Sequence, residues 1–127
     1  MEGGHCLYGS AQMDLSTSWQ GRVLVATLKG ELGMKEHAVL EAALVDIAKA
    51  DATGVVLNFA EVIYIASVGI GMLMKLVKEA KERGMGVRMA GARPAVKMVL
   101  EMVRAESVLP MDGTVAEAVE RVGAVGV

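Results

Sequence analysis

The chain has 127 residues, of which 54% are hydrophobic and 22% are charged, and its formal net charge is −2. This length predicts one domain whose core needs neither disulfides nor structural metal ions. The near balance of charge excludes an overall field that recruits nucleic acid or an anionic membrane. The single cysteine, Cys6, excludes an internal disulfide and fits a reducing compartment, so we expect a cytoplasmic protein.

The high apolar fraction does not predict a membrane span. The longest uncharged stretch near the middle of the chain, Val62–Met74, includes Ser67 and two glycines. It is shorter than the ~20 predominantly apolar residues that a span requires. The apolar excess and the ten methionines instead indicate a core between helices and a sheet, with some exposed apolar surface used for association.

The first third of the chain predicts a tail, two strands and a helix. Residues 1–12 lack periodicity and are rich in small residues, so we expect a flexible N-terminal tail. Met13–Ser18 and Arg22–Lys29 read as two strands joined by a tight turn that contains Gly21. Lys35–Ala50 then has apolar residues at helical spacing on one face.

The middle of the chain alternates strand and helix. Val55–Ala60 is rich in β-branched and large apolar residues, as expected of a strand that is covered on both faces. After a short turn, a helix is predicted from Ser67 to about Arg83, where Gly84 is a suitable C-terminal cap. Gly86–Ala90 reads as the next strand, and Pro94 opens the following helix.

The last part predicts a short strand at Ser107–Leu109, a turn at Pro110–Gly113 and a final helix capped by Thr114. Strand–helix alternation of this kind argues for an α/β domain with a mainly parallel or mixed sheet. We place this domain at residues 13–123 and expect a short C-terminal tail at 124–127.

The step from strand to helix at Ser67 is the most informative local feature. A hydroxyl there lies at the positive end of a helix dipole, beside backbone N–H groups that lack intrahelical partners. Two interpretations follow from that position. Ser67 is either an ordinary N-cap or a residue that receives a phosphate.

The residues that catalysis needs are missing. The sequence has no phosphate-binding P-loop motif, and Gly69-Ile70-Gly71 lacks the third glycine of a dinucleotide fingerprint because position 74 is Met. The two histidines, His5 and His37, are predicted in a tail and on a surface helix, away from any candidate nucleophile. We therefore expect no enzymatic activity, no cofactor and no metal site.

Three segments at suitable separations give the chain a resemblance to the STAS domain family, and specifically to bacterial anti-sigma factor antagonists. They are the turn Gly30-Glu31-Leu32, the strand that ends at the Ser67 turn, and the closing segment Val108–Ala118. The resemblance covers roughly residues 13–122. It implies a four- or five-stranded mixed sheet with helices packed on one side, and a protein-binding module without enzymatic activity.

The resemblance also implies partners. Members of the family bind a protein serine kinase that acts as an anti-sigma factor, are phosphorylated by it on a serine, and are restored by a serine phosphatase. Ser67 matches that phosphoacceptor. The residues that the resemblance assigns to the partner-binding surface are Gly30, Glu31, Leu32, Gly33, Ala66, Val68 and Gly69.

The chain departs from the family pattern next to the serine and in the turn. Ala66 replaces the usual Asp before the serine, Val68 replaces a common hydroxyl residue, and Gly33 stands where Asp is usual. Two further functions stay open. One is a scaffold subunit of a stressosome-like assembly of related STAS subunits, and the other is an accessory subunit of a membrane transporter. Neither implies binding to nucleic acid or direct binding to a membrane.

Overall fold

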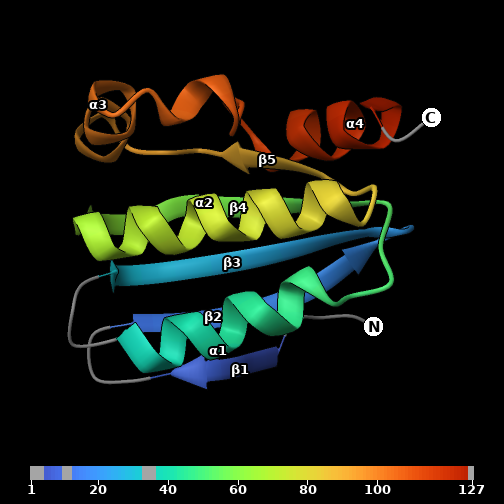
Figure 1. The fold of residues 1–127 in the computed structure, drawn as a ribbon, viewed down its shortest axis with the longest axis horizontal. Helices are drawn as coiled ribbons and strands as arrows, with labels where there is room; N and C mark the ends of the chain where they lie inside the picture. The colour runs from blue at the N-terminus through green and yellow to red at the C-terminus, as the bar shows by residue number, and fades with distance from the viewer. Residues whose placement is uncertain (1–4, 10–12, 33–36, 126–127) are drawn as a thin grey trace.

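Figure 1 shows the computed structural model, which describes residues 5–9, 13–32 and 37–125. One six-stranded sheet runs in the order β1-β2-β3-β4-β5-β6, antiparallel from β1 to β3 and parallel from β3 to β6. The predicted class, an α/β domain with a mixed sheet, is confirmed. In chain order the elements are β1 (His5–Gly9), β2 (Met13–Gln20), β3 (Val23–Leu32), α1 (His37–Ala48), β4 (Gly54–Ile65), α2 (Ser67–Glu82), β5 (Gly86–Ala90), α3 (Pro94–Met102), the 3-10 helix η2 (Ala105–Ser107), β6 (Met111–Asp112) and α4 (Val115–Val125).

The predicted hairpin of β2 and β3 is present, and Gly21 turns the chain with a φ of +62°. The expected flexible tail is wrong for residues 5–9, which form β1 and pair with β2 at the edge of the sheet. The remaining tail residues, 1–4 and 10–12, lie outside the described chain. At the other end, α4 continues past residue 123 to Val125, into the predicted C-terminal tail.

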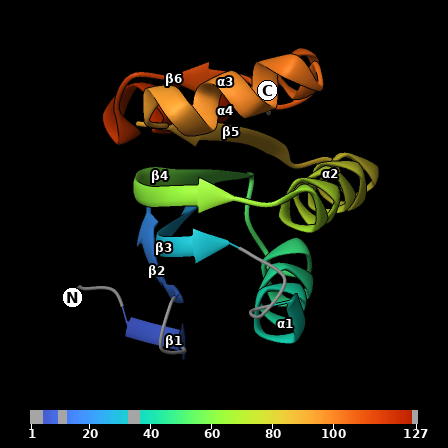
Figure 2. The ribbon, with the colours of Figure 1, turned by 90° about the vertical axis from the view of Figure 1, so that its left-hand side faces the viewer.

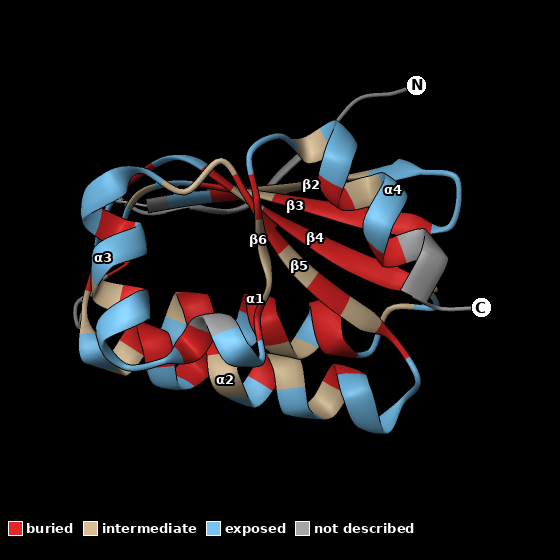
Figure 3. Ribbon diagram, turned by 90° about the horizontal axis from the view of Figure 1, so that it is seen from above, coloured by how far each residue is buried: buried red, intermediate tan, exposed pale blue. Residues whose placement is uncertain are grey.

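One face of the sheet holds the main core. α1 and α2 lie side by side on this face (Figure 2), and α3 adds Val96 and Leu100 to the same apolar cluster. The largest fully buried side chain is Phe59 of β4, and Figure 3 shows the inner strands buried between the helices. Burial of these β-branched and leucine side chains supplies most of the driving force for folding.

The opposite face is covered by α4, so the expectation of helices on one side only is wrong. Ala118 and Val122 of α4 pack on Val23, Val25 and Val56 of the sheet. This close approach needs a glycine beneath the helix. A Cβ on Gly54 would lie 2.6 Å from Cγ2 of Val122.

The strand β4 is longer than predicted, because it has two irregularities where a turn was expected. Its register with β3 slips between Thr27 and Lys29 and again between Gly30 and Glu31, each time with one additional residue in β4. The bulges let the strand continue to Ile65, so that α2 follows after a single residue, Ala66.

The C-terminal third differs in one place from the prediction. Ser107–Leu109 is not a strand, because Arg104 adopts a left-handed conformation (φ +60°) and the chain then turns into η2. The N–H groups of Val108 and Leu109 donate to the Ala105 carbonyl instead of to a strand. β6 forms two residues later, inside the predicted turn. Thr114 caps α4 as predicted.

Candidate functional site

The junction of β4 and α2 presents the predicted serine to solvent. Ser67 is the first residue of α2 and is exposed. The N-cap position belongs to Ala66, whose backbone is extended and whose side chain offers no hydrogen bond to the helix. The N-cap interpretation of Ser67 is therefore wrong. In the described part of the chain, the Ser67 hydroxyl has no hydrogen-bond partner.

The junction is held firmly against the end of β3. The Ala66 N–H donates to the Leu32 carbonyl at 2.9 Å, and the Ile70 N–H donates to the Ala66 carbonyl at 3.1 Å. A Cβ on Gly69 would lie 3.1 Å from the Leu32 oxygen and 3.2 Å from Cγ1 of Ile65. Gly69 therefore allows the first turn of α2 to lie directly on the strand ends, which fixes where Ser67 points.

The electrostatic setting of Ser67 favours a negative charge. The first turn of α2 contains no acidic residue that would neutralise the helix dipole. The N–H groups of that turn have no partner one turn earlier in the helix, because a helix starts with unpaired donors. Lys29 and Glu61 form an exposed ion pair, with 3.7 Å between Nζ and Oε2. They face each other on β3 and β4 before the strand ends that lead to Ser67.

The other predicted partner-binding residues separate into exposed and buried groups. Glu31 is exposed, and Gly30, Ala66 and Val68 are half-buried. Leu32 and Gly69 are buried, so their side of the turn faces the core. Gly33, the remaining member of the set, lies outside the described residues.

Two exposed apolar side chains beside Ser67 were missed by sequence reasoning. Ile63 and Tyr64, four and three residues before Ser67, are 53% and 55% exposed. Tyr64 is paired in register with Glu31 of β3. A signal was present in the sequence, because Phe59, Val62 and Ile65 are buried at every third position with two exposed residues between them. Such spacing marks a bulged strand, and alternation alone does not reveal it.

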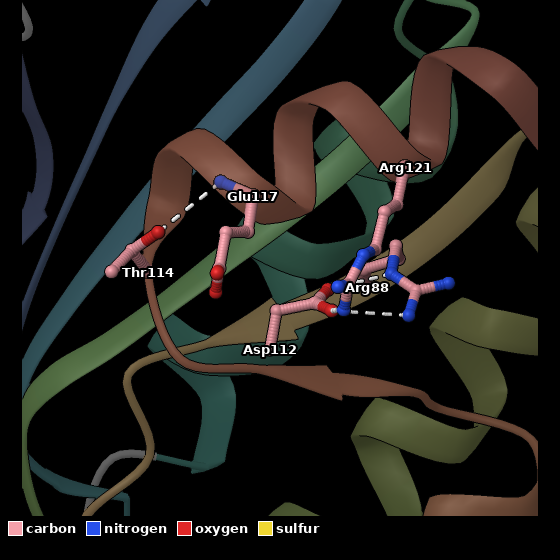
Figure 4. A network of polar contacts seen from close by, with 5 residues as sticks. All are labelled: Arg88, Asp112, Thr114, Glu117 and Arg121. Atoms are coloured by element: carbon pink, nitrogen blue, oxygen red, sulfur yellow. Dashed lines mark hydrogen bonds and ion pairs between the residues drawn. The ribbon is translucent and has the colours of Figure 1, made fainter.

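A second polar cluster lies on the face that α4 covers (Figure 4). Arg88 of β5 donates through Nε and Nη2 to the two carboxylate oxygens of Asp112, at 2.6 and 3.2 Å, and Arg121 of α4 donates to Oδ1. The Asp112 side chain is fully buried. The hydrogen bonds from Arg88 and Arg121 lower the pKa of Asp112, against the effect of burial, which raises it.

This cluster, which the sequence analysis did not find, joins three elements. β5, β6 and α4 meet at one carboxylate, and the Thr114 hydroxyl accepts a hydrogen bond from the Glu117 N–H at 3.2 Å, at the start of the same helix. Charges that satisfy one another in this way are typical of a structural clasp. The carboxylate of Asp112 is occupied by the two arginines.

Two kinds of site are missing from the described residues. Over the described ranges, no group of three or more His, Cys, Asp or Glu side chains is placed to hold a metal ion. No helix in these ranges has both the length and the apolar character that crossing a membrane requires.

Comparison with known proteins gives consistent results. The family model described as "Mlab, STAS domain" matches residues 15–110. No curated protein sequence matches the chain at a significant level. Several solved structures share the fold at low sequence identity.

An anti-sigma factor antagonist from Mycobacterium paratuberculosis has a TM-score of 0.79 at 19% identity, covering 92% of this chain and 99% of that one. The Bacillus cell fate determinant SpoIIAA in its phosphorylated form has a TM-score of 0.66 at 21% identity, with coverages of 85% and 98%. A sulfate transporter family protein from Wolinella succinogenes has a TM-score of 0.72 at 14% identity, with coverages of 85% and 90%. Because the family model matches well over half of the chain, the chain belongs to the STAS domain family.

Proposed function

We propose that this STAS domain is an anti-sigma factor antagonist whose binding to a partner is switched off by phosphorylation of Ser67. The partner is a protein serine kinase that also acts as an anti-sigma factor, and a serine phosphatase reverses the modification. The observation that carries this proposal is the exposed Ser67 hydroxyl, which caps no helix and is free to react. The likeness to an anti-sigma factor antagonist and to the phosphorylated form of SpoIIAA supports it.

The position of Ser67 explains how the domain tolerates a phosphate. Phosphorylation adds about −1.5 to −2 charges at neutral pH. At the first residue of α2 this charge meets unpaired N–H groups and the positive end of the helix dipole, and no acidic residue in the first turn opposes it. The domain therefore stays folded while the surface around Ser67 gains negative charge.

The surface around Ser67 explains why the same charge disrupts binding. Ile63 and Tyr64 offer exposed apolar area of the kind that a partner buries, and Glu31 adds a charge beside them. A phosphate next to an apolar contact must lose water when the partner binds, which opposes association. In this proposal Ala66, Val68 and Glu31 contact the partner.

The remaining residues of the predicted surface have a supporting role in the proposal. Leu32 and Gly69 hold the junction through the contacts described above, and Gly30 supplies a positive φ of 94° in the bulged strand. The domain acts in the cytoplasm as a binding module and catalyses no reaction itself.

The experiment that tests the proposal is a pull-down from the native host, followed by mass spectrometry of the captured proteins and of the modification state. Wild type and Ser67→Ala should capture a kinase-like partner, and Ser67→Asp should lose most of it. Ala95→Asp is the matched control, because it places the same charge at an exposed position in the first turn of another helix, α3. It should retain the partner.

Two outcomes contradict the proposal. One is a phosphate that maps to other residues and never to Ser67. The other is equal loss of the partner in Ser67→Asp and Ala95→Asp, because the charge would then act without regard to its position.

A scaffold subunit is the second candidate function, and exposed apolar side chains on α3 and just after it favour it. Met98, Met102 and Val103 are 59%, 77% and 55% exposed. Such a surface suits packing against related STAS subunits. Light scattering distinguishes the candidates, since a scaffold subunit enters a large particle with its co-purified relatives. An accessory role beside a transporter, which the Wolinella likeness favours, would instead give capture of a membrane protein in the same pull-down.

A further inference from the structure

An apolar groove opens beside the first half of β5, at the edge of the sheet that ends in β6. Its volume is about 620 Å³, within the range of about 300–1,000 Å³ that small-molecule sites usually have. The second half of α2, the strand β5, the loop before β6 and the end of α4 surround it. In Figure 3, α2 and α4 lie on either side of β5. The lining residues are Met74, Val77, Lys78, Lys81, Gly84, Met85, Gly86, Val87, Arg88, Ser107, Val108, Pro110 and Val122.

The groove exists because β6 is too short to cover β5. β6 pairs only with Met89 and Ala90, which leaves the first half of β5 without a neighbour on that side. Pro110 lies where the parallel ladder would continue, and it has no N–H to donate to the Val87 carbonyl. A longer β6 would fill the space beside the first half of β5. Because β6 is short, this space stays open between α2 and α4.

Strand addition by a peptide does not suit this edge. The Met85 N–H already donates to the Ala80 carbonyl at 2.8 Å, and the Met89 N–H donates to the Pro110 carbonyl at 2.8 Å. Only Val87, between them, directs its backbone groups to the open side, and this residue is buried. One residue is too short a ladder for recognition of an extended chain, which relies on repeated main-chain hydrogen bonds.

The charges at the groove are of one sign. Its side chains are mainly apolar, and its ionisable members are Lys78, Lys81 and Arg88, with no acidic residue among them. Arg88 is already bound to Asp112. Lys78 and Lys81 are exposed and form no ion pair with any described residue. In a chain with a net charge of −2, this is a local site for one anionic group beside an apolar body.

The type of anion follows from what surrounds the lysines. A phosphate is favoured by free arginines or by a helix N-terminus. Here the one lining arginine is occupied, and the lysines lie near the C-terminal end of α2, where the helix dipole is negative. A singly charged carboxylate fits this setting better than a doubly charged phosphate.

We propose that this groove binds a free medium-chain acyl carboxylate, with the alkyl chain against Val77, Val87 and Val108 and the carboxylate at Lys78 and Lys81. The site is independent of the proposed phosphorylation switch. Lys78 follows Ser67 by eleven residues in one helix, which is about 16 Å along its axis.

The test titrates sodium dodecanoate, below its critical micelle concentration, into the ¹⁵N-labelled full chain. Calorimetry gives the affinity, and amide shifts in NMR spectra locate the site. We expect saturable 1:1 binding with the largest shifts at Val87, Lys78 and Val108. Dodecyltrimethylammonium should bind at least about tenfold more weakly, because its charge has the opposite sign.

Variants separate the groove from non-specific binding of an amphiphile. Lys78→Gln/Lys81→Gln should weaken dodecanoate binding by up to about tenfold, and Val108→Trp should weaken it by filling the groove from an exposed position. Lys75→Gln/Lys97→Gln is the matched control, because it removes two exposed lysines that do not line the groove. It should bind as wild type does.

Three results overturn the assignment. They are equal binding of the anionic and cationic amphiphiles, equal weakening in the test and control variants, and amide shifts centred on Met98 and Met102 of α3. Dodecyl phosphate that binds at least tenfold more tightly than dodecanoate would show that the choice of a carboxylate is wrong.

Discussion

Two polar side chains of this domain are in opposite situations: Asp112 lies in strand β6, and Ser67 begins helix α2. Asp112 is buried and accepts hydrogen bonds from two arginines, so its charge is fully used in joining β5, β6 and α4. Ser67 is exposed at the start of a helix whose cap position belongs to Ala66, so its hydroxyl stabilises nothing. The Asp112 carboxylate therefore stabilises the fold, whereas the Ser67 hydroxyl is available to another molecule.

The largest effect is expected from removing the buried carboxylate. Asp112→Ala leaves the partly buried Arg88 without its partner, which should lower the free energy of unfolding by about 3 kcal/mol. Urea titration measures the change. Asp51→Ala is the control, because the Arg22–Asp51 pair is exposed and 3.5 Å long, and it should cause no measurable change. A similar loss in both variants would contradict the structural role of Asp112.

Acid should remove part of the same stabilisation. The arginines lower the pKa of Asp112 below its ordinary value of 3.8, so the unfolded chain binds the proton at a higher pH than the folded chain does. The contribution is complete above that ordinary value and is lost as the pH falls through the lower, folded-state pKa. The stability difference between wild type and Asp112→Ala should therefore be constant near neutrality and shrink in acid. A difference that grows in acid would refute the assigned sign.

A somewhat smaller effect is expected where α4 touches the sheet. Gly54→Ala places a Cβ 2.6 Å from Val122, which should cost about 1–3 kcal/mol through displacement of α4. Val122→Ala in the same chain should recover part of this loss, so that the two changes are not additive when measured by urea titration. Simple additivity would show that the two residues are not in contact.

The smallest pair of changes compares the two helix starts directly. Thr114→Ala removes a side-chain hydrogen bond to the Glu117 N–H and should cost about 1 kcal/mol. Ser67→Ala removes a hydroxyl without a partner and should leave the melting temperature unchanged. Loss of stability in Ser67→Ala as large as in Thr114→Ala would restore the capping role that the structure denies.

The sequence was sufficient to predict the elements that local patterns define. β5 has the predicted bounds, Pro94 begins α3, and Thr114 caps α4, because each depends on a few neighbouring residues. The extension of β4 to Ile65 was not predictable from alternation, since its bulges depend on the register with β3. The short β6 begins four residues later than the strand that was predicted, for a related reason, because η2 depends on the left-handed Arg104.

The candidate site was predicted in part. The family pattern pointed to Ser67, but it did not reveal that Ala66 takes the cap position or that Ile63 and Tyr64 are exposed beside it. The clasp at Asp112 was missed, because its partners are 24 and 9 residues away in the sequence and meet only in the folded sheet.

The most direct test of the account measures phosphate on the chain purified from its native host, by peptide mass spectrometry of wild type and Ser67→Ala. The account predicts one phosphate per modified chain, located at Ser67 and absent from the variant. Phosphate located at another residue, or persisting in Ser67→Ala, would contradict it.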